Sequence, residues 1–395
     1  MLGAIYIGLS GMNAYSKGLQ TISNNVANMN TAGFKANTVS FRDSFSQGGG
    51  GLTFQSGQDS EQSGTGVHIG PDNVDFRQGD LRQTGNDLDL AIQGKGFLTL
   101  IGEGQTYYAR TGEFAVDDKG FISQKGSGYK LAVLDASGQA VPLNLDSKRT
   151  SAPVATTRIS FADNLSSTAT DATVSNVNVF DSTGAKQVWQ VKFQPVGATA
   201  PGQWTVTVTD QAGATVGTST LKFLGGTVDP SASKLTITTA GANPQSVELD
   251  FSSGVTSFSS GTVSTLRAAS VDGSASGTLT QVTVNEDGQV KLTYSNGKTE
   301  LAGAVAIADF RNPEQLERIG NGLFESHGNG EYRLTASGSP GGGKLVSGQI
   351  EASNVDLAHE FGELILIQRG FQASSQVVSV SNDMIQQLFA MRGQG

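Results

Sequence analysis

The sequence predicts a mainly β protein with an α-helix at each end, and three observations support this fold class. Glycine is frequent, with 52 residues, and charged residues make up only 15% of the chain, against about 25% in an average domain. Short apolar runs alternate with turn pairs such as Lys95-Gly96 and Asn296-Gly297. Both ends carry apolar residues at intervals of three and four. We therefore expect nested β-domains with antiparallel or barrel-like sheets, and terminal helices that pair as an antiparallel coiled-coil core.

The N-terminal helix is expected over residues 2–28. Lys17 is its only charged residue, whereas a helix on the surface of a globular domain carries charges on its outer face. We therefore expect most of its circumference to be contacted by other groups. Its seam has Ser16 and Ser23 at two positions and apolar residues at the others: Ile5, Leu9, Met12, Leu19 and Val26.

The C-terminal helix is expected within residues 355–395 and is also poor in charge. Its seam has Gln368, Ser375 and Asn382 at three positions and apolar residues at the others: Leu357, Phe361, Leu364, Phe371, Val378, Ile385 and Phe389. We assign the apolar residues of both seams to self-association between copies. Core helices of a monomer show the same period, so this alternative stays open.

Turn-forming residues follow the first helix in the stretch NNVANMNTAGFK, residues 24–35. The Gly/Ser/Gln-rich residues 47–66 and the stretch SGSPGGGK, residues 337–344, are interpreted as flexible joints, with plain surface loops as the alternative. Seven residues are candidate hinge or turn positions: Asn28, Gly33, Gly48, Gly49, Gly50, Gly341 and Gly342.

These features divide the chain into four expected domains. They are a terminal helical assembly domain (1–30 and 355–395), a flexible connector (31–66 and 337–354), a discontinuous β-domain (67–149 and 281–336) and an inserted outer β-domain (150–280).

Composition excludes several classes of function. The net charge of −9 argues against a nucleic-acid partner, since phosphate contacts need Lys and Arg. The absence of cysteine excludes disulfides and thiolate chemistry. No apolar run approaches the roughly 20 residues of a membrane span, so we expect no membrane insertion. The N-terminus lacks the basic start and cleavage site of a Sec signal peptide.

No group of residues indicates catalysis, a cofactor or a metal site. His68, His327 and His359 are far apart and form no ligand pair. Asp87 and Asp89 share one face of an expected strand and are interpreted as turn caps. The stretch GKGF at 94–97 lacks the spacing of a phosphate-binding loop. We expect a protein that is not an enzyme.

Several stretches resemble the flagellar rod and hook protein family. GLSGMNAYSKGLQTISNNVANMNTAGFK resembles the N-terminal signature of the family, and QTGNDLDLAIQGKGFLTL and YARTGEFAVDDKGFI resemble its shared β-domain. GQIEASNVDLAHEFGELILIQRGFQASSQVVSVSNDMIQQL resembles its C-terminal helix. TVSFRDSF after Gly-Phe-Lys, the region with VFDSTGAKQVWQVKF, and the chain length favour the hook branch of the family.

The resemblance implies a structural subunit of the bacterial flagellar hook. Many copies would stack helically into a hollow, flexible tube outside the cell, a universal joint that transmits torque from motor and rod to filament. The implied partners are further copies, the rod, the hook cap and the hook-filament junction proteins. The flagellar type III export apparatus would export the chain without a cleaved signal.

Three alternatives stay open. A distal rod protein of the flagellar basal body is the nearest one within the family, and a secreted β-rich adhesin is the rival from another class. A carbohydrate-active enzyme is the third, suggested by the Ser/Thr-rich middle of the chain.

We also expect the terminal helices to be disordered in the monomer and ordered by assembly, because a lone neutral helix has no face to bury.

Overall fold

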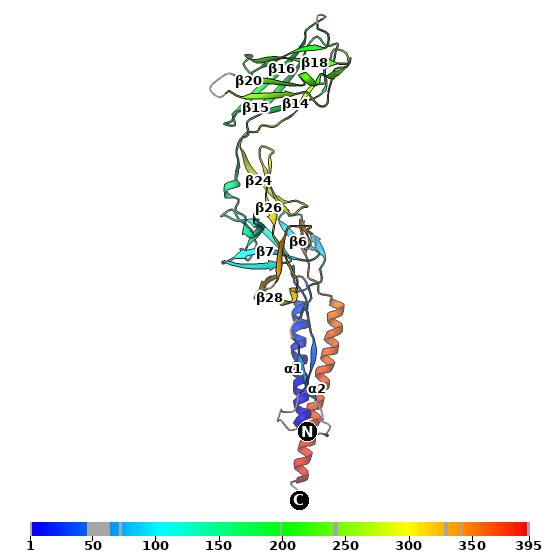
Figure 1. The fold of residues 1–395 in the computed structure, drawn as a ribbon. Coiled ribbons are helices and arrows are strands. Elements are labelled where there is room, and N and C mark those ends of the chain that lie inside the picture. Colours follow the sequence, from blue (N-terminus) through cyan, green and yellow to red (C-terminus); the bar gives the residue numbers. More distant parts are fainter. Residues whose placement is uncertain are drawn as a thin grey trace, which may run out of the picture. The chain divides into compact units, whose positions relative to one another are not determined.

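The computed structural model describes residues 2–45, 64–70, 73–197, 200–239, 244–327, 331–339 and 342–392. The chain forms two compact units. Unit 1 comprises residues 1–146, 282–291 and 301–395, and unit 2 comprises residues 147–281 and 292–300. The predicted fold class is confirmed, because both units are built mainly of strands and a long helix lies at each end of the chain (Figure 1).

The helices of unit 1 are α1 (Leu2–Ala27) and α2 (Leu357–Arg392), which run side by side and antiparallel (Figure 1). Gly8 lies against Val378, whereas Gly18 lies against Ile367. Later residues of α1 thus contact earlier residues of α2, as expected for antiparallel helices. Asp356 caps the start of α2, since its Oδ1 accepts a hydrogen bond from the backbone N–H of Ala358 at 2.9 Å. We call this helix pair the stem.

The β-body of unit 1 joins strands from both sides of unit 2 in the sequence. β7 pairs with β27, β11 with β26 and β6 with β31. Its strands before unit 2 are β5 (Leu81–Gln83), β6 (Asp89–Gln93), β7 (Phe97–Gly102), β8 (Gln105–Ala109), β9 (Thr111–Val116), β10 (Ile122–Gln124), β11 (Lys130–Leu134) and β12 (Ala140–Pro142). Those after unit 2 are β26 (Thr299–Val305), β27 (Ile307–Phe310), β28 (Leu316–Gly320), β29 (Leu323–Ser326), β30 (Tyr332–Thr335), β31 (Lys344–Ser347) and β32 (Gln349–Glu351).

Aromatic side chains fill one core of the β-body. The Phe97 ring lies 5.8 Å from the rings of both Phe310 and Phe324, and Phe76 packs against Phe97 at 5.5 Å. Among the described residues, no member of this core cluster comes from the stem. The β-body therefore has apolar packing of its own.

Unit 2 has a separate aromatic core. The rings of Phe161 and Phe251 stack at 4.5 Å and Phe193 meets Phe251 edge-on at 5.9 Å, while Trp189 is fully buried beside them. The strands of this unit are β13 (Thr150–Ser151), β14 (Arg158–Asn164), β15 (Ala172–Phe180), β16 (Lys186–Pro195), β17 (Gln203–Thr209), β18 (Thr215–Leu224), β19 (Thr227–Val228), β20 (Lys234–Thr238), β21 (Ser246–Asp250), β22 (Val255–Thr256) and β23 (Arg267–Val271).

The boundary between the units falls within β24 (Gly277–Val284), β25 (Gln289–Tyr294) and β26. Unit 2 thus includes residues 292–300 in addition to the whole of the expected insertion at 150–280. The expectation of antiparallel sheets is wrong for β14, which pairs in parallel with both β21 and β22. The reason is that β15 to β20 lie between these strands in the sequence, and so long an excursion lets the chain return in the same direction.

The segment after α1 contains strands where the sequence indicated a flexible connector. β1 (Asn37–Thr38) pairs with β4 (Asn73–Val74), and β2 (Phe41–Phe45) pairs with β3 (Gly64–Ile69). The β2–β3 hairpin lies along α1, where the Ser10 hydroxyl accepts a hydrogen bond from the N–H of Val67 at 3.2 Å. The candidate hinge residues Gly48, Gly49, Gly50 and Gly341 lie outside the described residues.

Candidate self-association surface

Small residues form the seam between the two stem helices. A Cβ atom at Gly370 would lie 2.5 Å from the Tyr15 ring, and one at Gly8 would lie 2.6 Å from Cγ2 of Val378. Because both distances are well inside van der Waals contact, a larger residue at either position would force the helices apart. The contact series on α1 has alternating intervals of three and four: Gly8, Gly11, Tyr15, Gly18, Ile22 and Asn25.

The predicted α1 seam therefore lies one residue away from the seam that joins α1 to α2. Leu9 is 47% exposed, and the other four predicted residues are half-buried: Ile5, Met12, Leu19 and Val26. The sequence pattern missed the seam because glycine does not register as an apolar residue. The self-association role of the five predicted residues stays a prediction.

The predicted α2 residues divide into two groups. Phe361 and Phe389 are exposed, at 53% and 69%. The others are half-buried: Leu357, Leu364, Phe371, Val378 and Ile385. Val378 packs on Gly8 of its own chain, so part of its apolar surface is already used within the molecule.

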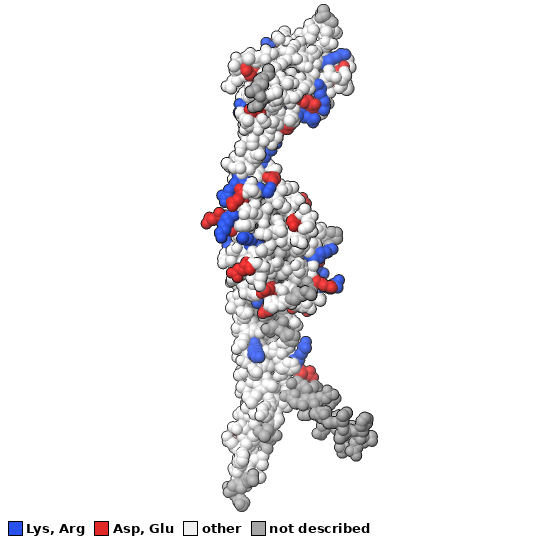
Figure 2. Space-filling model, turned by 60° about the vertical axis from the view of Figure 1, so that its left-hand side comes forward, with Lys and Arg blue, Asp and Glu red and all other residues white. Residues whose placement is uncertain are grey.

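The stem presents apolar surface in place of charge. Figure 2 shows Lys, Arg, Asp and Glu gathered over the β-strands, while the stem is almost free of them. Beyond the predicted residues, nine large apolar side chains are exposed among the described helix residues: Tyr6, Ile7, Ile365, Leu366, Val377, Val380, Met384, Leu388 and Met391. The sequence indicated these residues only through the lack of charge around the whole circumference of both helices. A heptad seam, which selects two positions in seven, does not include them.

Asn25 closes the end of the stem that meets the β-body. Its Nδ2 donates to the backbone oxygen of Asn37 at 2.9 Å and to Oε1 of Glu360 at 3.0 Å, and its Oδ1 accepts from the N–H of Asn37 at 3.0 Å. A single amide thus ties α1, α2 and β1 together. These bonds account for Asn25 in the Asn-rich stretch. Asn28 has a local role in the turn, since its Nδ2 donates to the backbone oxygen of Asn24 at 2.9 Å.

A buried ionic cluster then fixes both chain segments to the β-body. The Lys35 ammonium lies 2.6 Å from Oε1 of Glu351, and Nε of Arg110 lies 3.1 Å from Oε2. All three side chains are buried. We call this cluster the anchor. Its members come from the segment after α1, from β32 before α2, and from the residue between β8 and β9.

The remaining polar groups of the anchor are also bonded. Lys35 donates to the backbone oxygen of Arg77 at 2.7 Å, and Arg110 donates to the backbone oxygens of Gly96 and Ile92. Burial lowers the pKa of Lys35, while the nearby Glu351 carboxylate acts in the opposite direction. A buried charge pair is tolerated when its other hydrogen-bonding groups are satisfied, and this cluster meets that requirement.

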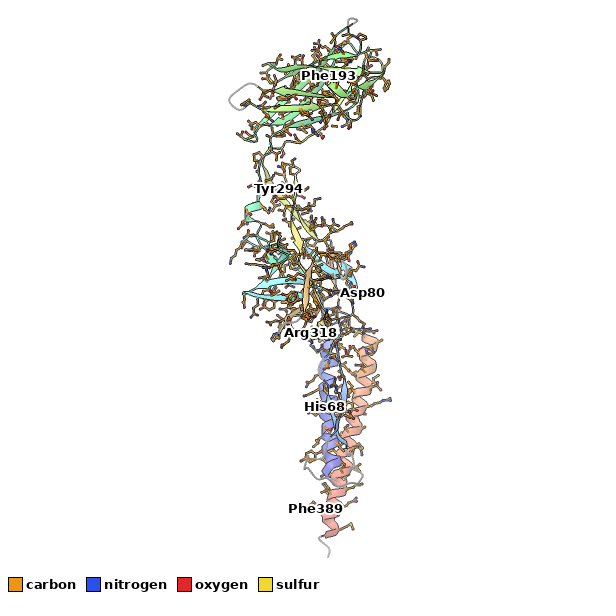
Figure 3. The ribbon with its side chains drawn as sticks, viewed as in Figure 1. His68, Asp80, Phe193, Tyr294, Arg318 and Phe389 are labelled. Atoms are coloured by element: carbon orange, nitrogen blue, oxygen red, sulfur yellow. The ribbon has the colours of Figure 1, made fainter. Side chains whose placement is uncertain are left out.

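Two further contacts hold the chain where it leaves α1. The N–H of Gly33 donates to the backbone oxygen of Glu351 at 2.8 Å. Gly33 has a φ of +69°, and a Cβ there would lie 2.9 Å from Cγ2 of Thr111, so both backbone and space favour glycine. The Arg318 guanidinium on β28 lies over the Phe34 ring at 4.6 Å, in the region where the stem meets the β-body (Figure 3).

The described hinge candidates are therefore in bonded surroundings. Asn28 and Gly33 lie in the turn after α1, and Gly342 lies in a bend beside Thr335. A hinge motion at Gly33 would have to break its contact with Glu351. The hinge role of these residues stays a prediction.

The other residues weighed in the sequence do not form one site. His68 lies beside the stem, on β3, in a groove of about 850 Å³ lined mainly by polar residues of α1 (Figure 3). His327 and His359 each face a glutamate at 3.4 Å. Within the described ranges there is no group of three or more His, Asp or Glu residues placed to hold a metal ion. Among the same residues, no helix is long and apolar enough to cross a membrane.

Four family models match successive parts of the chain. They are described as Flagella basal body rod protein (residues 5–35), Flagellar hook protein FlgE/F/G D1 domain (91–176), Flagellar basal body protein FlaE D2 domain (144–274) and Flagellar basal body rod FlgEFG protein C-terminal (346–391). The flagellar hook protein FlgE of Escherichia coli is 31% identical, over 97% of this chain and 98% of that protein.

The chain belongs to the flagellar hook protein FlgE family. The FlgE proteins of Treponema pallidum and Salmonella typhimurium are 28% and 29% identical, over 99% and 97% of this chain and 100% and 98% of those proteins. The crystal structure of the Helicobacter pylori hook protein FlgE2 has a TM-score of 0.49 at 14% identity, covering 67% of this chain and 98% of that one.

As a member of the hook family, the chain is a structural subunit of the flagellar hook. The full-length relatives carry the hook name, which decides against the distal rod protein and the adhesin. The anchor takes one residue from each of three hook-family regions: Lys35 from the N-terminal one, Arg110 from the D1 domain and Glu351 from the C-terminal one.

Proposed function

We propose that copies of this hook-family chain polymerise helically through their stems into a hollow, bendable tube. The tube acts as a universal joint that transmits torque from motor and rod to filament. The observation that carries this proposal is the apolar surface of the stem, which includes Phe361, Leu366 and Phe389 at 53%, 69% and 69% exposure. Soluble monomers rarely leave so many large apolar side chains together in water, and an apolar patch of this kind marks an interaction site.

Stem contacts of this type suit an open polymer. Successive copies would join different faces of α1 and α2, and such heterologous contacts continue without closing when the rotation between copies does not complete a ring. The glycine seam supports this arrangement, because it uses small side chains within the molecule and leaves the large ones for neighbours.

The anchor would transmit mechanical load from the stem to the β-body. Lys35 and Glu351 lie close in sequence to the ends of α1 and α2, and both meet Arg110 of the β-body in one buried cluster. A load applied to either helix would therefore reach the β-strands through charge-assisted hydrogen bonds as well as through the chain.

The tube would meet further flagellar components at its ends. We propose the rod on one side, the hook-filament junction proteins on the other, and a hook cap during growth. The flagellar type III export apparatus would deliver the chain to the outside of the cell without a cleaved signal. The hook identity of the full-length relatives supports these partners.

Truncation of the stem tests the proposal. Removing residues 1–30 or 360–395 from the full chain should abolish tubes in electron micrographs, while the β-sheet circular dichroism remains, because the aromatic core of the β-body uses no stem residue. Loss of the sheet signal with either truncation would assign the helices to the core of the monomer and would contradict the proposal.

Point variants separate assembly from folding more sharply. Phe361→Asp and Phe389→Asp replace exposed apolar groups, so they should block tube formation without changing the melting of the dilute chain. Ile367→Asp is the matched control, because Ile367 is buried against Gly18 of the same molecule and its loss should weaken the stem itself. Normal tubes from both Phe variants would contradict the proposal.

A further inference from the structure

Glu360 is a buried carboxylate with one unused oxygen. The residue is only 4% exposed. Its Oε1 accepts from Asn25, whereas its Oε2 has no hydrogen-bond partner among the described residues. Burial raises the pKa of Glu360, and the neighbouring carboxylates of Glu363 and Asp356 act in the same direction. A buried charged atom without a partner is costly, which indicates that a donor is missing.

The carboxylate forms part of the wall of a groove of about 540 Å³ where the stem meets the β-body. Five carboxylates line the groove: Asp75, Asp80, Asp356, Glu360 and Glu363. Among the described lining residues, Arg77 is the only Lys or Arg, and it is already paired with Asp75 at 2.6 Å. The groove therefore has an excess of negative charge. Since no group of described carboxylates is placed to hold a metal ion, a basic side chain suits it better.

The described part of the stem and its hairpin carries basic side chains that could supply this donor. Lys17, Arg42 and Arg369 form no ion pair within the described residues, and none of them lines the groove. Lys17 lies eight residues from Asn25 along α1, which is roughly 12 Å along the axis. Within one molecule, Lys17 is therefore too far along the helix to meet Glu360.

We propose that the groove receives a basic side chain from the stem of a second copy of this chain, and that the Glu360 carboxylate binds it. The inference rests on the proposed assembly and adds a polar contact to it. Apolar stem surfaces can slide past one another at little cost, whereas a charge pair at one level fixes the axial position of neighbouring copies. The basic side chain is that of Lys17, Arg42 or Arg369.

A double-mutant cycle on the full chain tests this contact. Glu360→Gln keeps an oxygen for Asn25 and removes the charge, and it is combined in turn with Lys17→Gln, Arg42→Gln and Arg369→Gln. We expect E360Q and one of the three to raise the concentration needed for polymerisation roughly tenfold each. The matching double variant should be no worse than either single variant, because both remove the same pair.

Three outcomes would overturn the inference. The first is that E360Q polymerises like the wild-type chain. The second is that the rise in polymerisation concentration caused by E360Q multiplies independently with that of each of the three basic-residue variants. The third is a fall in the melting temperature of the dilute E360Q chain that matches its loss of assembly. In each case the wild-type chain would still form tubes, so the proposed function would stand.

Cross-linking gives a second readout, because the chain has no cysteine of its own. Glu363→Cys at the groove is combined in turn with Lys17→Cys, Arg42→Cys and Arg369→Cys. One pair should give disulfide-linked copies in tubes and none in the dilute chain. Glu113→Cys, at an exposed position of β9, replaces Glu363→Cys in the control. Equal cross-linking of the control, or no cross-linking in tubes, would overturn the inference.

Discussion

At the residue scale, Glu351 shows how one buried charge organises a junction. Its carboxylate accepts from Lys35, from Arg110 and from the N–H of Gly79, while its backbone groups bond Gly33 and Thr111. These partners come from three other segments of the chain, namely residues 33–35, residue 79 and residues 110–111. Removal of a partner from such a cluster leaves buried cations without compensation, which costs far more than the loss of a surface pair.

We predict that Glu351→Gln destabilises unit 1 by about 3–5 kcal/mol. Sheet circular dichroism during urea unfolding should show this loss. Both tryptophans, Trp189 and Trp204, lie in unit 2, so the tryptophan fluorescence transition should not move. Glu113→Gln is the control, since its pair with Lys125 is about half exposed on each side and is worth about 0–1 kcal/mol. Equal effects of the two variants would contradict the role given to the anchor.

The hairpin turns predict a loss of stability in acid. In the turn at Asp181, bonds from the Thr183 hydroxyl and from the N–H of Ala185 hold the pKa of the Asp181 carboxyl below its usual 3.8. The Ser137 hydroxyl acts in the same way on the pKa of Asp135. Because the folded pKa is lowered, the stabilisation is present above pH 3.8 and is lost as the pH falls through the folded value.

The measurement for Asp181 is urea unfolding of unit 2, followed by tryptophan fluorescence as the pH is lowered from neutral to below 3.8. Asp181→Asn keeps the accepting oxygen and removes the charge. It should therefore make the midpoint less sensitive to acid than that of the wild-type chain. Superimposable pH curves for the two proteins would show that this turn does not contribute.

At the scale of elements, the stem depends on helices that approach closely. Tyr15 fits against Gly370, and Gly8 accepts the Val378 side chain. The β2–β3 hairpin covers another side of α1, where the Phe41 ring lies 5.2 Å from that of Tyr15. The remaining circumference of both helices is where the exposed apolar side chains lie.

Two glycines of α2 make a matched test of this packing. Gly370→Ala would place a methyl group 2.5 Å from the Tyr15 ring, whereas Gly362→Ala meets nothing within 4 Å. Both changes raise helix propensity by up to about 1 kcal/mol. We expect G362A to leave the melting temperature of assembled tubes unchanged or higher, and G370A to lower it. The same response from both variants would show that the seam is looser than these distances indicate.

At the scale of the whole molecule, the stem and the β-body of unit 1 differ in how many of their stabilising contacts lie within a single chain. The anchor and the aromatic core are complete within one chain. The stem, in contrast, leaves large apolar side chains uncovered in one chain. Segments with few buried apolar contacts open at a lower free energy than a packed core.

Hydrogen exchange measures this difference directly. In the dilute chain, the amides of α1 and α2 should exchange fast, while those of β6, β7 and β32 stay protected. In tubes, the helices should become protected as well. Slow exchange of both helices in the dilute chain would show that the stem is stable without neighbours, and the expectation of disordered ends would then be wrong.

The sequence by itself determined the fold class, the helical ends and the hook family. The evidence for these features is local in the sequence: the period of the apolar residues, the turn pairs, and the stretches around Gly33 and Glu351. Such patterns can be recognised without knowing which residues are neighbours in the folded chain. The shortage of charge also led to the expectation that other groups contact most of the circumference of the N-terminal helix, and this stays a prediction. The parallel pairing of β14 and the exact face of each helix were missed.

Only the tertiary structure decided which α1 residues meet α2 and which charges are buried together. The seam runs through glycines, whose value lies in the space they leave for Tyr15 and Val378, and a period count based on side-chain hydrophobicity cannot detect empty space. Glu351 lies 241 residues from Arg110 and 316 residues from Lys35 in the sequence. Their charges become partners only when folding removes them from water together, so no local pattern marks them as a site.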